Sequence, residues 1–201
     1  LAVVEYQTAI LQGDMAHAES LLPQVPSAQR GKIAKFLEAQ SMPDLALSVA
    51  TDPDHRFDLA VQLGQFDVAL DIARHGPASG AEMRWRTIGD QALAHWDVAL
   101  AQECFKHAND VHSLFLVATA QQDEALLRHV AEAARAKGEL NLAVAALVQL
   151  QDTRGVVDVL IQAQRLPEAA LFARTYAPHL VPETVRAWKA SIRAQSSQKQ
   201  Q

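Results

Sequence analysis

The chain has 201 residues, of which 49% are hydrophobic and 5% aromatic. This is enough apolar material for one large domain or a row of small repeats, and the low aromatic content with abundant alanine favours packed helices over strands. The net charge of −5 gives no global basic excess, so nucleic acid is not an expected partner. A single cysteine, Cys104, excludes an internal disulfide.

The sequence predicts no membrane-spanning helix, and no signal peptide is recognisable in it. No apolar run approaches the roughly 18 residues that a membrane span needs. The first ten residues include Glu5 and no basic side chain, unlike a signal peptide. Because Leu1 already lies within a helix-like pattern, we expect the sequence to be a piece of a longer protein.

Proline and glycine mark the ends of short helices along the chain. In the segment 51–64, Asp52 suits the N-cap, Pro53 the first helical position and Gly64 the left-handed residue that ends a helix. A second helix follows at 66–73, so this region is predicted to be a helical hairpin. The same signals predict helices at 28–40, 44–50, 82–94, 168–176 and 183–195, and a loop at 76–80.

A ten-residue pattern with alanine at its sixth position recurs along the chain, at intervals of roughly 18 to 30 residues. We predict that each alanine lies where neighbouring helices approach most closely, so that leucine there would overpack the core at a cost of about 1–3 kcal/mol. Trp96 aligns with Phe66 in this pattern, which favours packing, whereas exposed aromatic residues would be interface anchors. The seven alanines are Ala18, Ala46, Ala69, Ala99, Ala125, Ala143 and Ala169.

These patterns predict an all-α fold. The expected architecture is an α-solenoid of antiparallel, tetratricopeptide-like helical hairpins, with about 12–14 helices over residues 1–194. The polar residues 195–201 have nothing apolar to bury and are expected to form a disordered tail.

Residues with catalytic potential are few. Cys104 and His107 lie one helical turn apart, with Glu103 beside them, and such a pair is a possible nucleophile and base. No oxyanion loop or orienting third residue is evident, so we interpret Cys104 as a buried structural thiol. The eight histidines form no H-E-x-x-H pair and have no cysteine cluster near them. We therefore predict no catalytic, cofactor-binding or metal residues, and no enzymatic activity.

One face of the predicted C-terminal helix bears on surface contacts. On the predicted C-terminal helix, Arg186, Lys189 and Arg193 share a face that could contact an acidic membrane or partner. We prefer an ordinary solvated face, with Val185, Trp188 and Ile192 pointing inward.

A peptide-binding adaptor of tetratricopeptide type is an alternative. It would need a row of Asn, Lys and Arg in its groove. Asn109 and Asn141 stand alone, so partner-binding residues are not assigned.

Several longer segments resemble the α-solenoid of the coatomer β′ family, a component of the COPI vesicle coat. They are "TDPDHRFDLAVQLGQFDVALDIA" at 51–73, "ALAQECFKHANDVHSLFLVATA" at 99–120 and "RLPEAALFARTYAP" at 165–178, and the resemblance covers residues 3–192. In that family two WD-repeat propellers precede the solenoid and bind the dilysine retrieval signals of cargo. Nothing of the propellers is present here, so no cargo-binding residue is carried over.

The resemblance implies a structural scaffold of the COPI coatomer in Golgi-to-ER and intra-Golgi vesicle transport. The implied partners are the solenoid of the coatomer α subunit and other coatomer subunits. Membrane association would be peripheral and through the assembled coat, and the implied location is cytoplasmic, on Golgi membranes and COPI-coated vesicles. The alternatives are a peptide-binding adaptor and another solenoid subunit of a trafficking coat.

Overall fold

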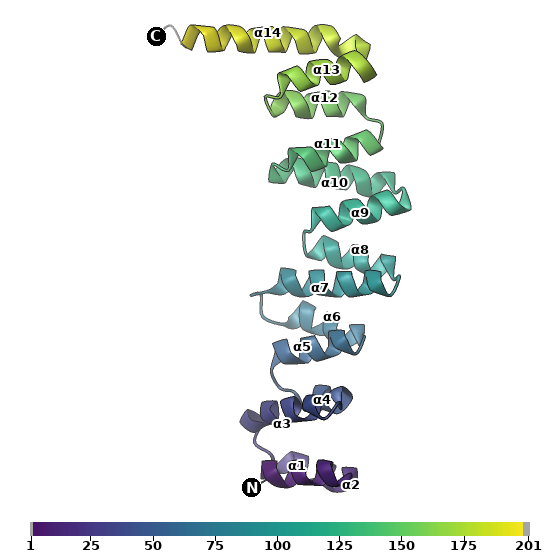
Figure 1. Cartoon of the computed structure of the whole chain (residues 1–201), viewed down its shortest axis with the longest axis vertical. Helices are drawn as coiled ribbons and strands as arrows, with labels where there is room; N and C mark the ends of the chain where they lie inside the picture. The colour runs from purple at the N-terminus through teal and green to yellow at the C-terminus, as the bar shows by residue number, and fades with distance from the viewer. Residues whose placement is uncertain (1, 199–201) are drawn as a thin grey trace. The chain divides into compact units, whose positions relative to one another are not determined.

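The computed structural model describes residues 2–198, which fold into two compact units, one ending at Ala108 and one starting at Asn109. In this part of the chain the regular structure consists of fourteen α-helices and two short 3₁₀ helices, with no strand (Figure 1). The predicted all-α class of helical hairpins is confirmed.

The first unit is a run of antiparallel hairpins, in which each odd-numbered helix packs on the helix that follows it (Figure 1). A 3₁₀ helix at Leu22–Gln24 follows the second helix. The helices are α1 (Ala2–Gln12), α2 (Met15–Leu21), α3 (Ser27–Ala39), α4 (Pro43–Val49), α5 (Pro53–Gln62), α6 (Phe66–His75), α7 (Ala81–Ala94) and α8 (Val98–His107).

In the second unit each helix packs on the next one along the chain. Its helices are α9 (Val111–Gln121), α10 (Glu124–Lys137), α11 (Leu140–Gln149), α12 (Thr153–Gln162), α13 (Leu166–Tyr176) and α14 (Val181–Gln198), with a 3₁₀ helix at Pro178–Leu180. Helix α14 continues beyond the boundary expected at residue 194. Of the expected tail, residues 199–201 lie outside the described residues.

The tight turns between helices share one backbone feature. The residue before the N-cap has a positive φ, which glycine adopts without a steric penalty and other residues adopt less readily. At several of these turns the N-cap is an aspartate, whose carboxylate accepts the backbone N–H three residues on and so fixes the start of the helix. The positive-φ residues that precede an N-cap are Gly13, Ser41, Gly64, Trp96, Asn109, Gln122, Gly138, Gln151 and Gln164.

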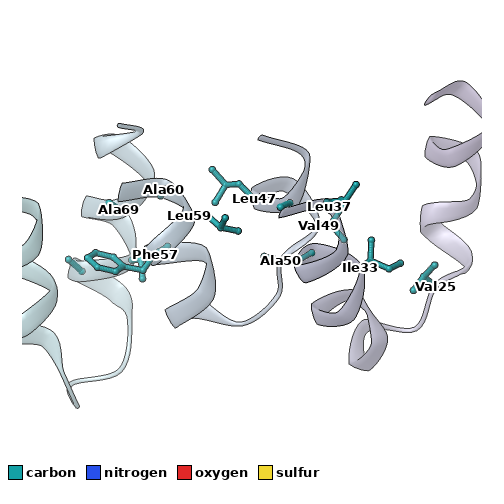
Figure 2. Close-up of a cluster of buried hydrophobic side chains, with 14 of the residues drawn as sticks. Val25, Ile33, Leu37, Leu47, Val49, Ala50, Phe57, Leu59, Ala60 and Ala69 are labelled. Atoms are coloured by element: carbon teal, nitrogen blue, oxygen red, sulfur yellow. The ribbon is translucent and has the colours of Figure 1, made fainter. Parts of the chain in front are cut away.

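The core of the first unit lies between the hairpins. Ile33 and Leu37 of α3 are fully buried, and Leu59 of α5 is 1% exposed (Figure 2). Ala69 of α6 is also fully buried, because a small side chain lets α6 approach its neighbours. The close-packing role predicted for alanine is confirmed at five of the seven sites, which are Ala18, Ala46, Ala69, Ala143 and Ala169.

The repeat alignment is wrong at two sites. Ala99 and Ala125 are exposed, and Ala101 and Leu127 occupy the buried position instead. The shift arises because Trp96 and Gln122, which carry no glycine signal, adopt the left-handed turn conformation. Trp96 is therefore equivalent to Gly64 and not to Phe66, and its 87% exposure contradicts the predicted packing role.

The 76–80 segment is a loop, as predicted, and a buried arginine holds it in place. The Arg84 side chain is 8% exposed and pairs with Asp54 of α5 at 3.0 Å. Its second terminal nitrogen donates to the carbonyl oxygen of Pro77. Asp52 occupies the predicted N-cap position of α5, but its side chain accepts no capping hydrogen bond.

Candidate protein-binding surfaces

The Cys104–His107 pair lacks the environment of a nucleophile and base. Cys104 is fully buried, and this burial, together with the neighbouring Glu103 carboxylate, raises the pKa of the thiol to about 11. A thiol with that pKa is protonated at neutral pH and unreactive. The His107 ring stacks on Trp85 at a centroid distance of 4.4 Å. Cys104 is thus a buried thiol of the core, and the exposed His107 packs on Trp85 of α7.

The histidines are dispersed. Three of them each approach one carboxylate: His55 lies 3.2 Å from Glu38, His75 lies 3.0 Å from Asp71, and His112 lies 3.3 Å from Glu139. Among residues 2–198, no group of three His, Cys, Asp or Glu side chains is placed to hold a metal ion.

The two asparagines considered for a peptide groove make contacts within the second unit. The carbonyl oxygen of Asn109 accepts a hydrogen bond from the Lys137 ammonium group. The side-chain oxygen of Asn141 accepts one from Arg165 at 2.6 Å. The Asn141 side chain is thus engaged within the fold, whereas Asn109 takes part through its backbone carbonyl.

The face of α14 differs from the prediction. Arg186, Lys189 and Arg193 are exposed, but so are Trp188 (37%) and Ile192 (50%), so the expectation that these two apolar side chains point inward is wrong. Among residues 181–194 of this helix, Thr184 is the fully buried one. None of the helices within residues 2–198 combines the length and the hydrophobicity of a membrane span.

One groove of the first unit lies between α6 and α8 and has a volume of about 500 Å³. We call it the α6–α8 groove. Apolar side chains line it together with two carboxylates, and His95, which precedes Trp96 in the adjoining turn, packs edge-on against Phe66 at 5.7 Å. Its lining residues are Gly64, Gln65, Phe66, Asp67, Val68, Leu70, Asp97 and Leu100.

A groove of the second unit, with a volume of about 420 Å³, has no ionisable lining apart from a tyrosine. We call it the α11–α13 groove, and it is lined by Val148, Gln151, Thr153, Val156, Phe172 and Tyr176. The Phe172 and Tyr176 rings contact each other at 4.9 Å. Tyr176 is 64% exposed and Val148 50%, and Leu171 on the same helix as the two rings is 61% exposed.

Sequence reasoning missed these exposed apolar residues because helical periodicity identifies an apolar face without saying whether a neighbour covers it. For Trp96 one signal was available. The following Asp97 is an N-cap like Asp14 and Asp123, which would have placed Trp96 in the turn.

Stacked helical hairpins define a helical-repeat protein, a class whose extended surfaces commonly serve as protein contacts. Residues 6–189 match the family described as the COPA/B TPR domain, and the chain belongs to that family. It is 40% identical over 192 residues to coatomer subunit beta′ of Drosophila melanogaster, and 38% identical over 192 residues to the proteins of the same name from Rattus norvegicus and Homo sapiens. Each alignment covers 96% of this chain and 21% of the relative, so the chain spans about a fifth of the length of these relatives.

Proposed function

We propose that this chain is a scaffold segment of a COPI coat subunit and that it binds another coatomer subunit through its helical surfaces. The observation that carries the proposal is membership of the COPA/B TPR domain family across residues 6–189. The relatives are named coatomer subunit beta′, and the chain resembles them over 96% of its length. As a coat subunit it would act at Golgi membranes and vesicles, as a peripheral component of the assembled coat and without catalysis.

The contact surface we propose for the partner subunit is the α11–α13 groove. The centre of a stable protein interface is depleted of charge and enriched in aromatic side chains. The lining of this groove has that composition, and two exposed side chains, Leu171 and Tyr176, extend from the helix that carries Phe172. A partner helix with an apolar edge would cover these side chains, and the proposed source of that helix is the solenoid of the coatomer α subunit.

Co-elution in size-exclusion chromatography tests this proposal. The purified chain is mixed with the solenoid of coatomer α at tens of micromolar, and a complex of both chains is expected. Tyr176→Asp places a charge in the lining of the groove, at a side chain that is 64% exposed, and should abolish the complex. Leu116→Asp is the matched control, because Leu116 of α9 is 63% exposed in the same unit but does not line the groove. If both chains are folded and no complex forms, the proposal is overturned.

A further inference from the structure

Trp96 is unusual for the turn in which it lies. Its φ of 62° is left-handed, a conformation that bulky residues adopt unfavourably. Its side chain is 87% exposed, so core packing does not compensate for that conformation. The equivalent turn residues in the first unit are Gly13, Ser41 and Gly64, which are small. Neither backbone geometry nor burial accounts for an indole here.

The residues on either side of Trp96 are close to the α6–α8 groove. His95 packs against Phe66, which lines the groove, and Asp97 lines it directly. Trp96 does not itself line this groove of mixed apolar and acidic character, but it is an exposed residue of the turn at the groove's edge. Tryptophan is enriched among the residues that dominate binding energy, especially next to a pocket that a partner can fill.

The charges of this groove indicate that a binding partner would be positively charged. Asp67 and Asp97 are its charged lining residues, both are exposed, and neither forms an ion pair with a described lysine or arginine. The Asp97 carboxylate also caps α8 by accepting the Leu100 N–H at 3.0 Å. The first unit has fourteen acidic and eight basic residues, a net charge of −6, so the surrounding field favours a cation.

We propose that the α6–α8 groove with Trp96 is a docking site for a basic amphipathic helix of a partner protein. The apolar side chains of that helix would lie on Phe66 and Leu100 and against the indole. Its lysines or arginines would pair with Asp67 and Asp97. Recognition by an apolar face in a groove is a common mode of helix binding, and charge complementarity adds specificity and speed of association.

The test uses fluorescence and calorimetry with a synthetic helical peptide of about 14 residues made of Lys, Leu and Ala, with lysines flanking a leucine stripe. The control peptide has glutamate in place of each lysine. The lysine peptide should bind at least about tenfold more tightly, with an affinity that falls as salt rises. Its binding should shift tryptophan emission to shorter wavelength, and this shift should be absent from a Trp96→Gly variant.

Two protein variants separate binding from folding. Trp96→Gly suits the left-handed turn, so it should leave thermal stability equal or higher while weakening binding at least about tenfold. An Asp67→Asn/Asp97→Asn variant removes both charges but keeps a capping side chain at residue 97, and it should lose the preference for lysine over glutamate.

Equal binding of the two peptides, or unchanged binding by both variants, would overturn the proposal. Self-association of the unmodified chain that Trp96→Gly abolishes would also overturn it, since a second copy would then be the occupant. The α11–α13 groove is intact in these variants, so failure here is distinguishable from failure of the proposed coat function.

Discussion

The contact between α7 and α8 can be tested by adding one methyl group. Gly89 lies inside α7, and a Cβ atom at this position would lie 2.6 Å from Cε1 and 2.9 Å from Cδ1 of Phe105. Carbon atoms pack at about 3.5–4.0 Å, so the ring would have to move by about 1 Å. The ring is fully buried on α8 and has little room to move. Overpacking of this kind costs about 1–3 kcal/mol.

Helix propensity works in the opposite direction. Alanine in a helix interior is favoured over glycine by about 1 kcal/mol, so Gly89→Ala should destabilise the first unit by a net amount of about 0–2 kcal/mol. Gly31→Ala is the matched control. Gly31 lies inside α3, and a methyl group added there would meet no atom within 4 Å, so alanine should stabilise the unit by up to about 1 kcal/mol.

Urea unfolding followed by circular dichroism measures both variants, and the two should differ by about 1–3 kcal/mol with Gly89→Ala the less stable. In a Phe105→Leu background the clash is relieved, and Gly89→Ala should no longer destabilise. The reasoning is refuted if Gly89→Ala stabilises the protein as much as Gly31→Ala does.

Three further predictions concern the packing of the first unit. Ala69→Leu should cost about 1–3 kcal/mol in urea unfolding because Ala69 is fully buried, whereas Ala99→Leu should be nearly silent; equal effects would mean that the corrected repeat alignment is wrong. The pKa of the Cys104 thiol is raised from 9.0 to about 11, so its thiolate is about a hundredfold scarcer than in the unfolded chain near pH 8, and iodoacetamide should alkylate it at least that much more slowly in the native protein; comparable rates would contradict its burial. The thiol's contribution to stability is full below pH 9.0 and is lost as pH rises through about 11. Arg84→Ala removes the partner of Asp54 and of the Pro77 carbonyl and should cost about 1–2 kcal/mol, because Asp54 is largely exposed to solvent. The same unfolding assay measures this cost, and unchanged stability would count against the role of Arg84 in holding the loop.

The hairpin architecture could be predicted from local signals. Pro53 at the start of α5 and Gly64 with a φ of 69° at its end act through their own backbone preferences, so the sequence alone locates them. Trp96 shows the limit of this reasoning. When a residue other than glycine adopts the left-handed turn conformation, its residue type does not reveal the turn. Because the turn at Trp96 was not recognised, the predicted repeat alignment at Ala99 was wrong by two residues.

The candidate surfaces were less predictable than the fold. Trp188 and Ile192 have the spacing of a buried helical stripe, and their exposure depends on whether another helix packs over them, which is a tertiary property. Residues far apart in sequence, such as Val148 and Tyr176, share one groove only after α11 and α13 are brought together by α12.

Isothermal titration calorimetry of the chain with the solenoid of coatomer α tests the central claim, that this segment is a coat scaffold contacting another coatomer subunit. The account predicts a saturable interaction with a dissociation constant at or below about 10 μM, with a negative heat-capacity change because apolar surface is buried. Tyr176→Asp should weaken it at least about tenfold, while Leu116→Asp should leave it unchanged. Absence of saturable binding between two folded chains at tens of micromolar, or equal binding by both variants, would contradict the account.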